Sequence, residues 1–307
     1  MNTYQFIKLH SRENPGFSIF LSLVLYLVGM VVILPLTGIL IGTGYGISLN
    51  DVLSIIGGDF SVHPQSETIF RLFQGANQLA TWGLVGVIMT HLLGIFPQVL
   101  GLRSQTPILA IVLAIFLLMI SFPLIQLFHL DLSFMGSWGE SMMAQEEKGQ
   151  EMLKRLVLKE STSQILFNIL VFAALPAICE EIFFRGFLQT QLYKWVNPHL
   201  AVWIGAFIFS LVHFQVPGLL SRMVPAVLLG YFFYSTKNVL PCILAHFFYN
   251  VLSILFTYVS ENSLVFEPKP GEFLAISLVS LILTGAVAYW YVKKYSPEHP
   301  HSESAHE

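Results

Sequence analysis

Charge is scarce in this sequence. Asp, Glu, Lys and Arg make up 11% of its 307 residues, whereas about 25% is usual in soluble domains. Hydrophobic residues make up 55%, and a soluble fold of this length cannot keep so large an apolar share away from water. The composition therefore favours a polytopic membrane protein whose main solvent is the bilayer.

Several common signatures are also absent. Lys and Arg number 15 against 18 Asp and Glu, and no basic block is present to neutralise phosphates, so a nucleic-acid partner is excluded. The sequence has no Walker A loop, no GxSxG elbow and no HExxH helix, which removes three enzyme classes. Cys179 and Cys242 are far apart in apolar segments, so we interpret them as buried residues, not as a disulfide or a thiolate metal site.

What the sequence does contain is a series of long charge-free runs. Only helices satisfy their own backbone in lipid, and no alternation of the barrel type appears, so the runs predict an all-α, polytopic membrane helix bundle with about eight transmembrane helices. Ala201–His213 and Met223–Thr236 are short for spans and also suit buried helices. The runs are Asn14–Asn50, Leu72–Leu102, Ser104–Leu130, Ser161–Cys179, Trp195–Ser221, Met223–Thr236, Val239–Ser260 and Phe273–Val292.

The runs divide the chain into five parts. Phe17–Ile41 is longer than the apolar core of about 7 to 15 residues in a secretory signal, so it predicts an uncleaved first helix. The predicted parts are N-terminal transmembrane helices at 1–130, a connector at 131–163, a core at 164–260, a C-terminal transmembrane helix at 261–295 and a polar tail at 296–307. The tail contains His299, His301 and His306, and its composition predicts disorder.

The connector has apolar residues at helical spacing between charges: Met152, Leu153, Leu156 and Val157. This pattern predicts an amphipathic helix at the membrane surface or, equally, a solvated connecting helix.

Lys and Arg in the loops give an orientation, because cytoplasmic loops are enriched in both. With the N-terminus in the cytoplasm, eight lie inside: Lys8, Arg12, Arg103, Arg185, Lys194, Lys237, Lys293 and Lys294. Three lie outside, Arg71, Arg222 and Lys269, and the connector adds Lys148, Lys154, Arg155 and Lys159. The ratio is eight to three without the connector and eight to seven with it. We therefore expect both termini inside.

Ionisable groups inside apolar runs are costly and usually functional. In the segment PAICEEIFFRGFL, Glu181 and Arg185 are i, i+4 neighbours that can pair on one helix face. Glu180 points about 100° away and stays available as a proton acceptor. Pro176 removes a helix hydrogen bond and can kink the helix beside this group. A structural alternative is that both glutamates reach water at the headgroup boundary.

A second set of polar groups lies on two later helices. His246 and Asn250 share one face at i, i+4, and His213 ends another apolar stretch. An imidazole pair, an amide and a carboxylate are the groups that amide hydrolysis requires. Two histidines and Glu180 would equally suit a zinc ion with an open water position. The residues leave zinc-dependent and metal-free chemistry open.

These residues resemble the CPBP family of intramembrane endopeptidases, also called ABI, which processes CAAX proteins and bacteriocins and includes the Ras-converting prenyl protease. The family's EExxxR motif is EEIFFR at Glu180–Arg185, its FxxxH motif is FSLVH at Phe209–His213, and its HxxxN motif is HFFYN at His246–Asn250. Order and spacing agree, and the resemblance covers roughly Gln164–Ser260. Three motifs in order on apolar helices are a strong signal.

The resemblance implies an eight-helix fold with a conical cavity open to the cytoplasm, in the plasma or inner membrane if the source is bacterial. It implies that Glu180 activates water with help from His213, while His246 and Asn250 stabilise the oxyanion. Glu181 and Arg185 would support the site. The substrate would be a membrane protein or peptide, cleaved near its C-terminus or its membrane anchor.

Two other classes compete with the endopeptidase. A non-catalytic scaffold of the immunity type would use the cavity to hold a peptide, and intact motifs argue against it. A proton-coupled transporter would also place acids and histidines at membrane depth, but no internal repeat is visible. Substrate identity, prenylation and oligomeric state are left open by the sequence.

Overall fold

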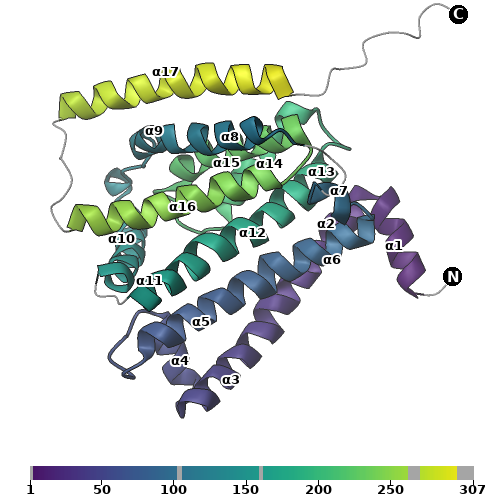
Figure 1. Cartoon of the computed structure of the whole chain (residues 1–307). Helices are drawn as coiled ribbons and strands as arrows, with labels where there is room; N and C mark the ends of the chain where they lie inside the picture. Colours follow the sequence, from purple (N-terminus) through teal and green to yellow (C-terminus); the bar gives the residue numbers. More distant parts are fainter. Residues whose placement is uncertain (1–2, 102–105, 159–161, 262–269, 296–307) are drawn as a thin grey trace, which may run out of the picture.

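Figure 1 shows the computed structural model, which describes residues 3–101, 106–158, 162–261 and 270–295. Every regular element in these ranges is a helix, which confirms the all-α class. The elements are α1 (Thr3–Glu13), α2 (Pro15–Val28), η1 (Gly29–Ile33), α3 (Leu34–Tyr45), α4 (Leu49–Ile56), α5 (Ser66–Gln78), η2 (Leu79–Gly83), α6 (Leu84–Leu93), α7 (Phe96–Val99), α8 (Ile108–Ile120), α9 (Phe122–Leu127), η3 (Ser133–Met135), α10 (Ser137–Leu158), α11 (Thr162–Asn168), η4 (Ile169–Ala174), α12 (Leu175–Glu181), η5 (Ile182–Gln189), α13 (Thr190–Leu192), α14 (Pro198–Leu211), α15 (Leu219–Thr236), α16 (Leu240–Glu261) and α17 (Pro270–Tyr295).

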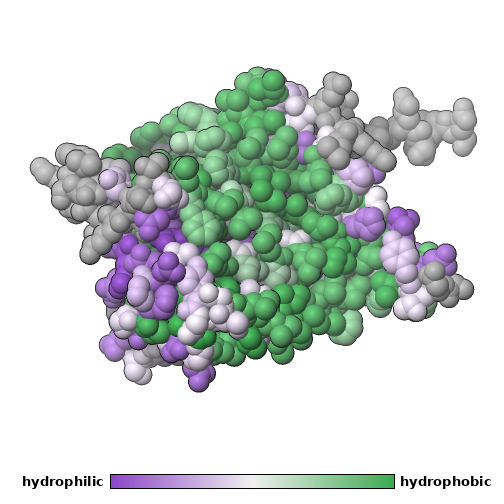
Figure 2. Space-filling view, turned by 60° about the horizontal axis from the view of Figure 1, so that its bottom comes forward, coloured by the Kyte–Doolittle hydropathy of each residue, from purple (hydrophilic) through white to green (hydrophobic). Residues whose placement is uncertain are grey.

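Long apolar helices make this an integral, multi-pass membrane protein. Within the described ranges, four helical stretches are long and apolar enough to cross a bilayer: Pro15–Tyr45, Ser163–Leu192, Leu240–Tyr258 and Gly271–Tyr295. Ile108–Ile120 and Pro198–Leu211 are apolar but shorter. In Figure 2 a broad hydrophobic zone lies between hydrophilic groups at two opposite ends of the molecule, as lipid on the sides and water at the ends require.

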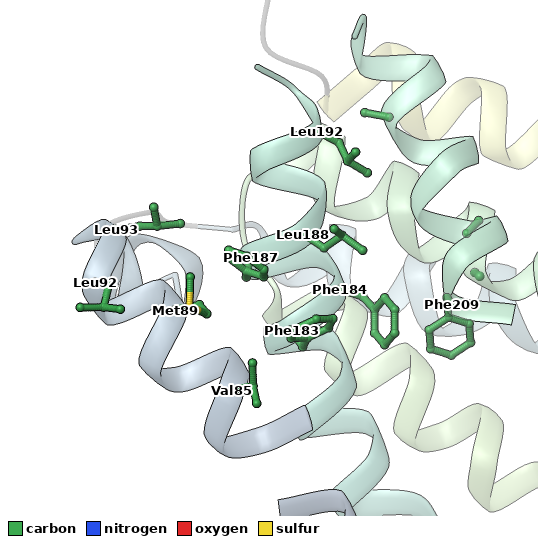
Figure 3. Close-up of a cluster of buried hydrophobic side chains, with 13 residues drawn as sticks. Val85, Met89, Leu92, Leu93, Phe183, Phe184, Phe187, Leu188, Leu192 and Phe209 are labelled. Carbon is green, nitrogen blue, oxygen red and sulfur yellow. The ribbon is translucent and has the colours of Figure 1, made fainter. Parts of the chain in front are cut away.

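The stretch from α11 to α13, here called the central helix, passes through the middle of the bundle (Figure 1). Its first half contacts α16 on one side and η2 on the other, and η5 in its second half contacts α6. In Figure 3 the side chains of η5 and α6 point toward one another and form an apolar cluster that includes Phe183, Phe187 and Met89. The central helix is thus supported by helices that are distant in sequence.

Two predicted boundaries are wrong, both because a charge was taken as the end of a span. The run that was expected to end at Cys179 continues as helix to Leu192, because Glu181 and Arg185 are buried as a pair inside it. The run that was expected to begin at Met223 begins at Leu219 and includes Arg222. Most of α15 is buried, which supports its interpretation as a helix behind others.

Three of the wide, π-helical turns adjoin either a Leu-Pro pair or the glutamate pair of the central helix. Proline lacks an N–H and its ring crowds the carbonyl four residues earlier, so a regular helix cannot continue unchanged through it. The π-helical turns η1 and η4 end just before the Leu-Pro pairs that contain Pro35 and Pro176, and they widen the helix there. The third, η5, begins directly after Glu181. Such turns are frequent at functional sites.

Two helices mark opposite ends of the bundle (Figure 1). At the α1 end, Lys194 lies between α13 and α14, and its Nζ donates to the carbonyl oxygen of Arg12 at 3.0 Å. Helix α14 begins at this end. At the α10 end, α14 is complete and the backbone N–H of Gly218 donates to Glu146 Oε2 at 3.1 Å. The helix α14 thus runs from the α1 end of the bundle to the α10 end.

The predicted amphipathic helix is confirmed as α10, and its apolar face packs on protein. Leu156 is buried with Met152 nearby in one apolar cluster, and Leu153 packs against Ile254 of α16. The side chain of Val157 and the tail histidines His299, His301 and His306 lie outside the described residues. Cys179 and Cys242 are buried free thiols, as interpreted from the sequence.

Candidate active site

A cavity of about 280 Å³ lies beside the first half of the central helix. Glu180, His213, His246 and Asn250, predicted from the sequence, all line its wall. The remaining lining residues are Gln78, Leu118, Phe172, Pro176, Phe209, Ser221, Arg222, Pro225, Ala226, Leu229 and Tyr249. The fold therefore brings the three motifs, from α12, the end of α14 and α16, around one space.

Glu181 and Arg185 lie behind the cavity as a fully buried pair. Arg185 Nη1 donates to Glu181 Oε1 at 2.7 Å, as the i, i+4 spacing predicts. Arg185 Nη2 also donates to the carbonyl oxygen of Ala226 at 3.0 Å, and its guanidinium lies 5.0 Å from the ring centroid of Phe209. The pair thereby ties α12 and η5 to α15 and α14, two helices that line the cavity.

His246 is joined to the same carboxylate, which the sequence analysis did not foresee. Its Nδ1 lies 2.8 Å from Glu181 Oε1. An ionised carboxylate can only accept a hydrogen bond, so Nδ1 carries the hydrogen and Nε2 is left for the cavity. In a neutral ring Nε2 then holds a lone pair, and it donates to an oxyanion only when the ring is protonated.

His213 is held in a similar way by its own helix. Its Nδ1 lies 2.8 Å from the carbonyl oxygen of Phe209, which can only accept. The lone pair of His213 therefore also lies on Nε2, and the ring is part of the cavity wall. Both histidines thus have their Nδ1 hydrogens engaged and their Nε2 atoms available for chemistry.

Glu180 remains separate from the Arg185 pair. The residue is 5% exposed, and Gln78 Nε2 donates to its Oε1 at 3.1 Å. No cation within the described ranges lies in ion-pair distance of it. Sequence analysis missed Gln78, although an amide inside the charge-free run Leu72–Leu102 is a usable signal. The amide orients the carboxylate without neutralising it.

The arrangement of the donor groups decides whether the cavity could hold zinc. Histidines whose second nitrogen is bound to a carboxylate or carbonyl are typical of metal sites, and both histidines here have that arrangement. In the described part of the chain, however, no three His, Cys, Asp or Glu side chains are close enough to hold one ion. The set of His213, His246 and Glu180, which the sequence left open as zinc ligands, does not fit a metal in this arrangement, and the mechanism below uses none.

The cavity lies toward the α10 end. Its lining includes the last residues before and the first turns after the α14–α15 connection, which contacts Glu146 of α10. Helix α1 lies at the opposite end of the bundle (Figure 1). Three of the basic residues counted for the orientation do not lie in exposed loops, because Arg185 and Arg71 are buried and Arg222 lines the cavity. Without them the count that includes the connector changes from eight against seven to seven against five, which still favours the α1 end as the cytoplasmic one.

Comparison with known proteins identifies the segment that carries the site. Residues 162–252 match the family model described as type II CAAX prenyl endopeptidase Rce1-like. This range includes all three motifs, and the resemblance inferred from them is confirmed. The match extends from α11 into α16, and the Rce1-like family is a protease family. No curated protein and no solved structure matches the chain.

Proposed function

We propose that the protein is an intramembrane endopeptidase that hydrolyses a peptide bond of a membrane-associated or lipidated protein or peptide, in processing of the CAAX type. One observation carries this proposal. Glu180, His213, His246 and Asn250 surround a single cavity within the Rce1-like segment. A carboxylate, two imidazoles and an amide at membrane depth have no packing role that would demand this combination.

Water activation is assigned to Glu180. Its carboxylate accepts a proton from a water molecule. The Nε2 lone pair of His213 accepts a hydrogen bond from the other O–H of the same water and thereby orients its oxygen. The water oxygen attacks the peptide carbonyl carbon, and the carbonyl oxygen becomes an oxyanion. Glu180 then delivers its proton to the leaving nitrogen as the C–N bond breaks. The products are a carboxylic acid and an amine.

Oxyanion stabilisation is assigned to His246 and Asn250. The amide of Asn250 donates one hydrogen bond, and the Nε2–H of a protonated His246 donates the second. Glu181 fixes the orientation of this ring, because its carboxylate lies 2.8 Å from Nδ1. Arg185 holds the same carboxylate from the other side. Glu181 and Arg185 are therefore positioning residues.

The cavity is proposed to open to the cytoplasm, as the family resemblance implies. The α10 end then faces the cytoplasm, and α1 lies on the opposite side of the membrane. This departs from the expectation of a cytoplasmic N-terminus, which seven basic residues against five still favour, and it gives more weight to the family resemblance. A cysteine introduced at the exposed Glu151 of α10 should react with a membrane-impermeant maleimide only after the cytoplasmic face is opened. Labelling from the outside of intact cells would overturn this orientation.

The proposed activity is tested with purified protein in detergent and a set of lipidated and unlipidated reporter peptides. Wild type should cleave at least one peptide, and Glu180→Gln should lose this activity. Glu151→Gln is the matched control, because it removes an exposed glutamate outside the cavity. A parallel series with a chelator, and with zinc added back, checks the metal-free mechanism. Binding without cleavage by wild type would favour the scaffold function instead.

A further inference from the structure

One cation lines the cavity beside the proposed catalytic groups. Arg222, in the first turn of α15, is the one Lys or Arg among the described lining residues. The residue is close enough to His213 for its charge to act on that ring, and Glu180 acts on the same ring from its own position. Both a carboxylate and a guanidinium of the cavity wall thus act on His213. The mechanism proposed above uses the carboxylate and leaves the guanidinium without a role.

The guanidinium is fixed in place by uncharged groups. Its Nη1 donates to Gln215 Oε1 at 3.0 Å, and its Nη2 donates to the carbonyl oxygen of Gln215. Both acceptors are uncharged. The charge of the nearby Glu146 carboxylate acts on Arg222, but within the described residues no ion pair joins the two. Glu146 accepts from the Gly218 N–H and lies 3.2 Å from His129 Nε2 instead. Arg222 therefore has no carboxylate of the described chain in direct contact at the cavity wall.

Two polar atoms beside this charge are buried and lack a partner in the described part of the chain. They are the Nε of Arg222 and the hydroxyl oxygen of Ser221, whose residue is 8% exposed and also lines the cavity. An unsatisfied buried donor costs free energy, so a bound ligand that accepts from it is favoured. The N-terminus of the 18-residue helix α15 adds a partial positive charge at the same place.

The position of the guanidinium depends on Gly218. A Cβ atom at Gly218 would lie 2.5 Å from Arg222 Nη1 and 3.1 Å from Glu146 Oε1, so any larger residue would push the guanidinium away. A planar, fixed guanidinium matches a carboxylate through paired N–H donors. The cavity volume of about 280 Å³ leaves room for a short peptide segment and little else.

From these observations we infer that Arg222, with Ser221, binds the free C-terminal carboxylate of the substrate. This inference rests on the proposed endopeptidase function and makes it more specific. The scissile bond lies at Glu180 and His213, and the carboxylate lies at Arg222 in the same small cavity. The leaving peptide is therefore short, and substrates cut a few residues from their own C-terminus are preferred over those cut in the middle of a long chain.

The test compares two forms of one S-farnesylated reporter peptide that ends in cysteine, two aliphatic residues and a fourth residue. One form has a free C-terminal carboxylate and the other a carboxamide. Wild type should cleave the acid about 10- to 100-fold more efficiently in kcat/KM, the effect of one buried charge-assisted contact. The ratio should fall to about one in Arg222→Gln. In Arg222→Lys it should be intermediate, because the charge stays and the fork is lost.

Arg155→Gln is the matched control, because it removes an arginine that is 53% exposed at the same end of the bundle. It should keep the wild-type ratio. Equal cleavage of acid and amide by wild type would overturn the inference and leave the protease intact, and it needs no variant to fold. A full acid preference in folded Arg222→Gln would overturn the role of Arg222.

Two further outcomes distinguish a peptide carboxylate from a lipid phosphate as the ligand of Arg222, and distinguish failure of this inference from failure of the proposed function. Thermal stabilisation by phosphatidylglycerol that requires Arg222, together with equal cleavage of acid and amide, would assign the site to a lipid phosphate and overturn the inference. If wild type cleaves neither peptide, the proposed function fails. Binding of the fluorescent acid and amide peptides to the same protein then decides on Arg222, and equal affinity would overturn its role.

Discussion

The two halves of the central helix differ in what surrounds them. Before Glu181 the helix lines a polar cavity and touches Gln78, whereas after it the side chains of Phe184, Phe187 and Leu188 are buried among apolar groups (Figure 3). The packed half also contains Arg185, which binds Glu181, and its apolar packing fixes the position of the lining half. Rigid support of this kind is what a catalytic constellation needs, because small displacements of its groups are costly.

The two adjacent glutamates give the sharpest test of this difference. Glu180→Gln should reduce kcat by about 10²- to 10⁴-fold, the usual contribution of a general base, while the protein melts like wild type. Glu181→Gln should instead lower stability by about 3–5 kcal/mol, because it leaves the buried Arg185 without its counter-charge. Activity assays and thermal melts of both variants measure this. Equal melting temperatures for the two variants would contradict the division of roles.

Removing an aromatic ring tests the packed half directly. Phe187 is fully buried, with its ring centroid 5.6 Å from that of Phe183. Phe187→Ala should lower the free energy of unfolding by about 3–5 kcal/mol, because the void left by the missing ring cannot collapse fully. The measurement is the melting temperature together with kcat per folded molecule. A variant of normal stability that loses its activity would mean that the packed half has a catalytic role.

Close packing of the same half predicts a smaller effect at Gly186. A Cβ atom there would lie 2.6 Å from Val99 Cγ1, too close for an unchanged structure. Gly186→Ala should therefore destabilise by about 1–3 kcal/mol through overpacking. The double variant Gly186→Ala with Val99→Ala should recover part of that loss, because it provides the missing space. No recovery would show that the strain lies elsewhere.

Sequence patterns located the lining half well and the network behind it poorly. The i, i+4 rule identified the Glu181–Arg185 pair, and the three motifs identified the elements that meet at the cavity. The pattern could not show that His246 shares Glu181, because that contact joins residues 65 apart in the sequence. Arg222 was missed for the same reason, because a cation that interrupts an apolar run gains meaning only from the fold. Gln78 was missed although an amide inside a charge-free run is a usable signal.

Span boundaries failed where charges were buried. Counting charge-free residues assumes that each charge lies in water, and Arg71 contradicts this assumption. It is fully buried in α5, and its Nε donates to Asn168 Oδ1 of α11 at 2.7 Å. Such a residue ends a run in the sequence without ending a helix. The same assumption placed Arg71, Arg185 and Arg222 in the loop count, although the first two are buried and the third lines the cavity.

The smallest effect is expected where a charge is neither buried nor part of the cavity. Asp51 forms a capping box with Ser48 at the start of α4, and hydrogen bonds from the Ser48 hydroxyl and backbone N–H lower the pKa of Asp51. A carboxyl group whose pKa is lower in the folded state stabilises the fold at pH values above its unfolded-state pKa. This contribution is lost as the pH falls through its folded-state pKa. Melting temperature should thus drop slightly in acid, and the drop should shrink in Asp51→Asn. Because the group is exposed, kcat at neutral pH should not change, and a variant that lost activity there would place this distant loop in contact with the site.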